Sequence, residues 1–395
     1  MNKQYNDFIR LYALAFAGIG SLYPLLGQYL TSIGFSGVEI GTLTATGTAI
    51  GIFASPFWGG QYYRRNNDKR LIMLLCLLAA VVAASLLFTK SFLIFYLLYG
   101  LFAFFQLPIM PLNDAMVLET KVPYGSVRMW GAIGFALGVF FAGQIASVVG
   151  LIIVLPLCSL LFLAGGWTVW RIVKSAVGEK GNKNSYDIDS DEDLSSKLCY
   201  SILFKNKKFI KLLVCAFFIA GTTVAHNTYF GFLYISVGGS IAGIGVAFLL
   251  MCGSEAPFMA WAGKISSKLG MERIILIAMI LSAARFIWYS LGPPWWLLLG
   301  TFFLQGVVNG ILLVELVRYV AKVVRPKMIG VAMTLYQSLS FNFSTIICQL
   351  VGGTILDSYG GRGVYLFFGL SNLIGLILYV AFGLHKGSLQ TDKSL

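Results

Sequence analysis

Long apolar stretches separated by short polar turns run through the whole chain of 395 residues. A helix needs about 20 apolar residues to cross the hydrocarbon of a bilayer. Stretches of that length predict twelve membrane-spanning helices, and most of the turns between them carry Gly, Ser or Pro. The predicted spans are 8–30, 38–62, 70–89, 92–118, 126–148, 151–173, 209–236, 241–265, 272–291, 295–321, 328–354 and 361–384.

One long polar insert, 174–208, interrupts this pattern and contains the run GEKGNKNSYDIDSDEDLSSK. A run this polar cannot bury enough apolar surface to pack, so we predict a mobile cytoplasmic linker. The fold class is therefore an all-α membrane protein, with pseudo-symmetric six-helix bundles at 1–173 and 209–395.

Composition supports the membrane assignment and excludes other classes. Hydrophobic residues make up 58% of the chain and charged residues only 11%, whereas soluble domains carry roughly a quarter charged residues. The six Cys are scattered singly with no CxxC pair, so we expect neither disulfides nor a metal site. No nucleophile–base set or phosphate loop is visible, so we expect no enzyme and no cofactor.

Charge then predicts the orientation, because Lys and Arg near helix ends are retained on the cytoplasmic side. Of the 29 Lys and Arg residues, 25 fall on the side of the N-terminus and two, Lys90 and Arg362, on the other. We expect a monomer in the cell inner membrane (the plasma membrane) with both termini cytoplasmic. Lipid headgroups account for the net charge of +13, so no nucleic-acid partner is expected.

The two halves repeat each other at a shift of 204 residues. Gly41 opens the second span and Gly59 closes it eighteen residues later, as Gly245 and Gly263 do in the eighth span. Repeated helical halves are typical of transporters that rock around a midplane binding site.

The loop after each of these spans resembles the Gly-x-x-x-Asp-Arg/Lys-x-Gly-x-Arg-Lys/Arg signature of the major facilitator superfamily. The resemblance implies two gating loops on the cytoplasmic side. Both copies lack the acid of the signature, with Tyr63 and Ser267 in its place, so we expect a weaker or differently built latch. The matching residues are Gly59, Arg64, Lys69 and Arg70 in the first loop, and Gly263, Lys268, Gly270 and Arg273 in the second.

The segments PLNDAMVLE, YGSVRMWGAIGF, AHNTYFGFLY, GSEAPFM and LSAARFIWY are similar to the branch that contains the lactose and phenylpropionate permeases. This resemblance implies a proton-coupled symporter that works by alternating access. Gln305 and Val308 replace the His and Glu that couple protons in the lactose permease, and Phe135 stands where that permease stacks a Trp on its sugar. These departures argue against a plain galactoside symporter.

Four ionisable residues, Asp114, Arg128, Glu255 and Arg285, qualify best as charged groups deep within a predicted span, and such residues are functional by default because burying a charge is costly. Asp114 and Arg128 sit on adjacent antiparallel spans joined by a short turn, so we expect them to face each other. Carboxylate acceptors and a guanidinium fork suit recognition of hydroxyl or carboxylate groups. In the lactose permease branch the matching pair binds sugar. The alternative is a buried ion pair that only locks the two spans together.

Glu255 is the candidate proton carrier, because desolvation disfavours the charged form of a carboxyl group in an apolar span. We expect Arg285 opposite it, either as a coupling partner or as one half of a static clamp. His226 is a candidate relay or ligand, with a packing role as the alternative. Further side chains expected to complete the substrate pocket are Tyr23, Gln28, Asn113, Phe135, Asn227, Tyr229, Asn309 and Gln337.

The favoured function is import of a small polar solute, a sugar or oligosaccharide, together with protons. Transport of aromatic carboxylates or nucleosides is the alternative on the wider branch resemblance. A proton-driven drug or lipid exporter remains open, although two arginines within the spans count against it. The internal repeat disfavours a receptor or a channel.

Overall fold

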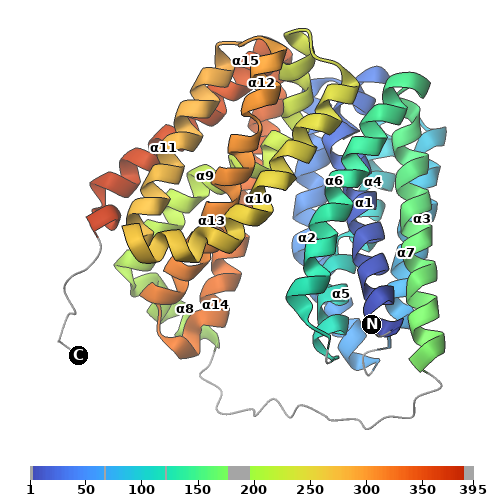
Figure 1. Cartoon of the computed structure of the whole chain (residues 1–395), viewed down its shortest axis with the longest axis horizontal. Coiled ribbons are helices and arrows are strands. Elements are labelled where there is room, and N and C mark those ends of the chain that lie inside the picture. The colour runs from blue at the N-terminus through green and yellow to red at the C-terminus, as the bar shows by residue number, and fades with distance from the viewer. Residues whose placement is uncertain (1–2, 66–67, 121, 177–195, 387–395) are drawn as a thin grey trace.

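The computed structural model describes residues 3–65, 68–120, 122–176 and 196–386, and every regular element in these ranges is a helix. The helices form two bundles that stand side by side (Figure 1). The first bundle contains α1 Lys3–Ser32, α2 Gly37–Arg64, α3 Arg70–Ser85, α4 Phe92–Gln106, α5 Ile109–Leu118, α6 Tyr124–Val149 and α7 Val154–Ala176. The second contains α8 Ser196–Lys205, α9 Lys207–Ser236, α10 Ile241–Leu269, α11 Met271–Ser290, α12 Trp295–Thr301, α13 Phe303–Val323, α14 Ile329–Leu335, the π-helix η4 Tyr336–Phe343 and α15 Ser344–Ala381.

The all-α membrane fold predicted from the sequence is confirmed, with breaks inside three of the predicted spans. The fourth span divides into α4 and α5, the tenth into α12 and α13, and the eleventh into α14, the π-helix η4 and the start of α15. Ten stretches of the described chain are long and apolar enough to cross a membrane, and the last of them runs from Ile329 to Ala381. Gly360 lies within that stretch at φ 66°, where the chain leaves the helical conformation and separates the last two spans.

The range predicted as a linker contains more structure than expected. Helix α7 continues to Ala176, and α8 forms at Ser196–Lys205. Ile202 and Leu203 pack with Phe209 in the core of the second bundle, which is why this part of the polar insert is helical. The remaining residues of the insert, 177–195, lie outside the described ranges.

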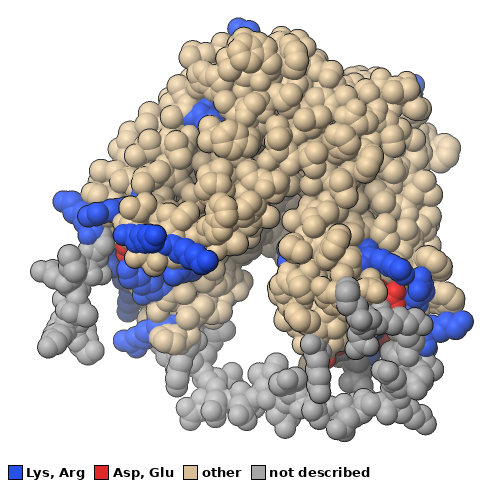
Figure 2. Space-filling model, viewed as in Figure 1, with Lys and Arg blue, Asp and Glu red and all other residues tan. Residues whose placement is uncertain are grey.

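Basic residues gather at one end of the molecule (Figure 2). Figure 2 also shows the molecule hollowed between its two halves at this end, and we call this space the central hollow. We call this end the basic end. The helices that begin or end there carry Arg64, Arg70, Lys174, Lys207, Lys268, Arg273 and Lys322 in their terminal turns.

The two bundles contact each other toward the opposite end. Glycines allow the backbones to approach closely there, and a Cβ added at Gly245 of α10 would lie 2.9 Å from the Val139 carbonyl oxygen of α6. Asp357 of α15 also accepts hydrogen bonds from the backbone N–H groups of Gly37, at 2.5 Å, and Val38, at 2.8 Å, at the start of α2. The molecule is therefore joined at the opposite end and separated at the basic end.

Candidate functional site

The Asp114 carboxylate lies at the centre of a polar cluster in the first bundle. Arg128 donates from Nη1 to Asp114 Oδ1 at 3.1 Å and to Oδ2 at 3.3 Å. The Tyr12 hydroxyl donates to Oδ1 at 2.5 Å, and the Arg128 guanidinium lies 4.8 Å from the centre of the Phe16 ring. We call Tyr12, Phe16, Asp114 and Arg128 the Asp114 cluster. The predicted contact between Asp114 and Arg128 is confirmed.

The pair is not sealed inside the bundle. The Asp114 side chain is 26% exposed and that of Arg128 is 42% exposed. Burial strengthens the attraction within an ion pair, although it also costs the hydration of both charges, and an ion pair that only locked two helices would need no access for a solute. Both ends of this pair can instead be reached by a solute.

Two prolines help to bring this pair together. The fourth span breaks at Leu107 and Pro108, and α5 begins immediately afterwards, so Asp114 lies on a short helix that is separate from α4. Pro123 precedes α6 as its N-cap residue and places Arg128 about one turn into that helix. Proline is well suited to both positions, because it has no N–H to donate and cannot continue a preceding helix.

Tyr12 and Phe16 were missed by the sequence analysis. They lie one turn apart on α1, and Tyr12 precedes Asp114 by 102 residues in the sequence. Aromatic residues are frequent in every span of this chain, so their spacing on α1 gave no signal that they would meet a carboxylate.

Other residues predicted for the pocket in the first bundle do not join the Asp114 cluster. Tyr23 donates to Gln106 Oε1 at 2.7 Å, within the same bundle. Asn113 lies on the same helix as Asp114 but is fully buried. Its side-chain atoms have no hydrogen-bond partner in the described part of the chain. Gln28 lies against Gly231 where α1 meets α9, and the Phe135 backbone packs against Gly20.

Glu255 lies on α10 where that helix packs closely on α13. A Cβ added at Gly310 would lie 2.7 Å from the Glu255 carbonyl oxygen. The Asn309 side chain, predicted for substrate binding, instead lies beside the Glu255 carboxyl group. Asn309 also accepts a hydrogen bond from Gln305 Nε2 at 2.9 Å. Glu255 is therefore part of a polar group with two amide side chains.

The expected pairing of Glu255 with Arg285 is wrong for this conformation. Arg285 forms no ion pair with any carboxylate that the structure describes. Its guanidinium lies over the rings of Phe286, 4.4 Å away, and Tyr289, 5.6 Å away. The two residues face different neighbours, because α10 packs mainly on α13 and α6, whereas α11 packs mainly on α15.

His226 is fully buried in the same region of the second bundle. Its Nδ1 atom is hydrogen-bonded to the Tyr365 hydroxyl of α15, and its ring is surrounded by other aromatic rings. The structure thus groups His226 with Arg285 and separates both from Glu255.

Three further predicted residues have different environments. Tyr229 donates to the Gln349 carbonyl oxygen at 2.6 Å, which ties α9 to α15. Asn227 is partly buried and its Oδ1 has no partner among the described residues, whereas Gln337 is exposed on the π-helix η4. Gln349 was missed by the sequence analysis, although its side chain contacts Thr44 of the first bundle and Thr228 of the second, each at 3.0 Å.

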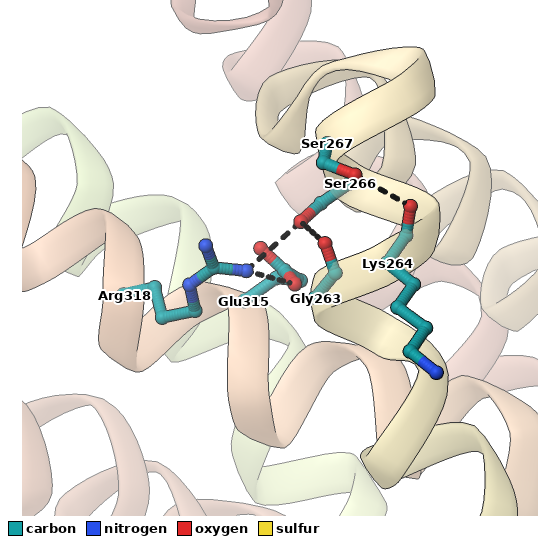
Figure 3. A network of polar contacts seen from close by, with 6 residues as sticks. All are labelled: Gly263, Lys264, Ser266, Ser267, Glu315 and Arg318. Atoms are coloured by element: carbon teal, nitrogen blue, oxygen red, sulfur yellow. Dashed lines mark hydrogen bonds and ion pairs between the residues drawn. The ribbon is translucent and has the colours of Figure 1, made fainter.

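The loops at the basic end are held by contacts other than the missing signature acid. In the second half, Arg318 donates to Ser266 Oγ and to Glu315 Oε1, both at 2.9 Å, beside Gly263 (Figure 3). Ser267, which replaces the acid, donates instead to the Lys264 carbonyl oxygen. The expectation that this latch is built differently therefore agrees with the contacts found.

The remaining loop residues differ in their surroundings, and some lie beside an ion pair while others are exposed. Lys322 Nζ of α13 forms an ion pair with Glu272 Oε1 at 2.6 Å. Glu272 immediately precedes Arg273 in the sequence. In the first half, a Cβ added at Gly59 would meet open space, and Arg64 is exposed. The Tyr62 hydroxyl donates to Glu119 Oε1 at 3.4 Å. Burial raises the pKa of the Glu119 carboxyl group, and nearby Lys69 and Tyr62 oppose that rise.

Comparison with known proteins identifies the family. A model of the MFS_1 like family matches residues 7–367. The chain is 30% identical over 391 residues to the maltose permease of Geobacillus stearothermophilus, covering 98% of this chain and 96% of that protein. It is 23% identical over 293 residues to the probable 3-phenylpropionic acid transporter of Escherichia coli (strain K12), covering 70% and 71%.

The fold is also that of a solved transporter. The crystal structure of the nucleoside transporter NupG matches with a TM-score of 0.81, covering 97% of this chain and 99% of that chain at 16% identity. Clusters of His, Cys, Asp and Glu able to hold a metal ion are not found among the described residues. The family match and the maltose permease relative both span nearly the whole chain. The chain therefore belongs to the MFS_1-like family and is a membrane transporter of the major facilitator superfamily, not an enzyme.

Proposed function

We propose that this transporter imports a sugar or oligosaccharide together with protons. The observation that carries the proposal is the Asp114 cluster, a carboxylate and a guanidinium held together and still partly exposed. Similarity to a maltose permease over nearly the whole chain supports a sugar as the substrate. Sugar hydroxyls both donate and accept hydrogen bonds, and this cluster offers acceptors and donors side by side.

Each member of the cluster has a role in this proposal. Asp114 accepts hydrogen bonds from substrate hydroxyls, and Arg128 donates to other hydroxyls or ring oxygens. Tyr12 holds Asp114 in place through its hydroxyl. Phe16 offers a ring face beside Arg128, on which an apolar face of a sugar can stack.

Proton coupling is assigned to Glu255. Its carboxyl group is partly buried on α10, and the neighbouring Asn309 can hydrogen-bond to either of its protonation states. Since Arg285 does not hold it as an ion pair in this conformation, the proton can be gained or lost without breaking a salt bridge. Glu255 is therefore suited to bind one proton per transport cycle.

The arrangement of the two bundles fits alternating access. We infer that the basic end faces the cytoplasm, because Lys and Arg are retained there. The central hollow then opens inward, and the contacts of Asp357 with α2 close the outer side. In this proposal the protein is a monomer of the plasma membrane with both termini cytoplasmic.

An aromatic carboxylate is the second candidate substrate. Arg128 and Phe16 together could bind a carboxylate and a ring, and the chain is similar to a probable 3-phenylpropionic acid transporter. In that case Asp114 would repel the substrate, which is why the sugar is favoured.

Uptake into proteoliposomes tests the proposal. The purified protein is reconstituted, an inward proton gradient is imposed, and accumulation of radiolabelled maltose is compared with that of 3-phenylpropionate. We expect maltose to accumulate and a protonophore to abolish its accumulation. Accumulation of the carboxylate alone would favour the second candidate, and uptake insensitive to the protonophore would exclude proton coupling.

A further inference from the structure

The second bundle contains buried hydrogen-bond donors that have no acceptor. The Arg285 side chain belongs to a residue only 5% exposed, and its Nε, Nη1 and Nη2 atoms have no partner among the described residues. His226 is fully buried, and its Nε2 atom also lacks a partner there. Both side chains contact the same ring, that of Phe286.

Aromatic rings enclose these two side chains. The His226 ring centre lies 5.1 Å from that of Phe302, 5.5 Å from that of Phe230 and 5.6 Å from that of Phe286. The guanidinium of Arg285 rests on the ring of Phe286. Ring faces attract a cation, but they cannot accept the directional hydrogen bonds of five N–H groups. We call Arg285, His226 and the rings around them the aromatic enclosure.

The neighbouring polar layer on the same helices is fully paired. One turn away on each of α9 and α11, Ser282 donates to Asn372 Oδ1 at 2.8 Å, and Asn372 Nδ2 donates to Thr222 at 2.7 Å. In this layer the buried polar side chains are satisfied, as such groups in proteins nearly always are. Neutral side chains such as Asn113 and Asn227 also lack partners, but at Arg285 every nitrogen atom of a charged side chain is unpaired among the described residues.

The hydrogen bond at the other ring nitrogen indicates that His226 Nε2 is a donor. The Tyr365 hydroxyl is bonded to His226 Nδ1, and it has no other acceptor among the described residues. The hydroxyl hydrogen of Tyr365 therefore takes part in a hydrogen bond only if the hydroxyl donates to His226 Nδ1. The neutral imidazole then carries its own hydrogen on Nε2. All the unpaired atoms of the enclosure are accordingly donors.

No carboxylate among the described residues forms an ion pair with Arg285. The carboxylates described in the second bundle are engaged elsewhere: Glu255 lies beside Asn309, Glu272 bonds Lys322, Glu315 bonds Arg318 and Asp357 bonds the start of α2. A water molecule could accept a hydrogen bond but would leave the charge uncompensated. A buried unpaired charge costs several kcal/mol in general.

We propose that the aromatic enclosure is an anion-binding site, in which Arg285 and the Nε2–H of His226 hold one monovalent anion. One uncompensated positive charge calls for one negative charge, and the donors supply its hydrogen bonds. Two sources fit this chemistry, namely a free halide such as chloride or a carboxylate group of an organic solute. The site is distinct from the Asp114 cluster and does not rest on the proposed transport of a sugar.

Thermal unfolding of the purified full-length protein tests the site. Sodium chloride, sodium bromide or sodium acetate is titrated at constant ionic strength, with sodium sulfate as the balancing salt. We expect a saturable rise in melting temperature, roughly 2–4 °C at about four times the dissociation constant. The rise should be lost in Arg285→Gln and retained in Arg318→Gln, whose arginine already has a carboxylate partner.

The two anion sources give different results. Stabilisation by chloride and bromide indicates a free halide, and stabilisation by acetate alone indicates a carboxylate of a solute. Either result supports the site if Arg285→Gln abolishes it. The site is excluded if none of the salts stabilises the parent protein saturably, or if Arg285→Gln responds as the parent does.

Bromide also tests the site without any substitution. In crystals of the unaltered protein grown with sodium bromide, anomalous scattering should place a bromide within hydrogen-bond distance of Arg285 and His226. If Arg285→Gln does not fold, this measurement decides the question. Bromide found only elsewhere, together with no anomalous peak after soaking with bromoacetate, would overturn the proposal.

Discussion

Arg128 donates to both carboxylate oxygens of Asp114, at 3.1 and 3.3 Å, across the short connection between α5 and α6. The two side chains are 42% and 26% exposed, so the pair forms part of an accessible surface. Such a pair contributes little stability, because partly exposed ion pairs are screened by water. Its contribution to recognition of a solute is expected to be much larger.

The substitution Asp114→Asn should weaken sugar binding and leave folding intact. Hydrogen bonds to a charged group contribute roughly 1.5–3 kcal/mol, so we expect the dissociation constant to rise roughly 10- to 100-fold. Binding is measured by calorimetry with maltose, and folding by thermal unfolding. Tyr23→Phe is the control, since Tyr23 bonds Gln106 within the bundle, away from the Asp114 cluster. Unchanged affinity in Asp114→Asn would remove this residue from the site.

The substitution Tyr12→Phe tests the part of the cluster that comes from α1. The hydroxyl of Tyr12 orients Asp114 through a hydrogen bond of 2.5 Å, while the ring itself can remain in place. Loss of one hydrogen bond should raise the dissociation constant for maltose roughly 2- to 10-fold, less than Asp114→Asn does. The double variant should lose little more than Asp114→Asn alone, because both changes act on the same carboxylate. Additive losses would mean that Tyr12 contacts the sugar independently.

Sequence reasoning succeeded where the contact is local. Asp114 and Arg128 are 14 residues apart, on antiparallel spans joined by one short turn, so their meeting follows from chain direction alone. The break inside the fourth span lies at Pro108, and proline commonly ends or kinks a helix. The pattern of apolar stretches also predicted most helix bounds to within a few residues.

It failed where the rotation of a helix about its axis decides which side chains meet. Glu255 and Arg285 lie on consecutive helices, as Asp114 and Arg128 do, yet Glu255 lies beside Asn309 and Arg285 lies on aromatic rings. Both helices are apolar around most of their surface, so no hydrophobic face in the sequence reveals their rotation. Long-range contacts such as Tyr12 with Asp114 have no sequence signal in a single chain.

The substitution Glu255→Gln should abolish accumulation of maltose against its gradient, because glutamine cannot carry a proton. Exchange of internal for external maltose should persist, since this exchange needs no net proton movement. Both are measured in proteoliposomes with and without a proton gradient. Glu315→Gln is the control, since that carboxylate lies at the basic end and bonds Arg318. Undiminished uphill transport in Glu255→Gln would remove Glu255 from the coupling mechanism.

The contact between Asp357 and the start of α2 should control how often the opposite end opens. The carboxylate accepts from two backbone N–H groups, at 2.5 and 2.8 Å, where the positive end of the helix dipole favours a negative charge. Because Asp357 is exposed, such a contact contributes roughly 0.3–1 kcal/mol. Asp357→Ala should therefore raise the population open at that end roughly two- to fivefold, which is measured by electron–electron distances between spin labels at exposed Lys90 and Trp296.

Ser36→Ala provides the matched control for this experiment. Ser36 caps the same helix α2 through its own capping box, and its side chain hydrogen-bonds Glu39 and no residue of the second bundle that the structure describes. If Asp357 acts by joining the bundles, Ser36→Ala should lower thermal stability but leave the distance distribution unchanged. If Asp357 acts only as a helix cap, the two variants should behave alike. Equal distance distributions in the parent and in Asp357→Ala would show that the glycine contacts between the bundles suffice to keep that end closed.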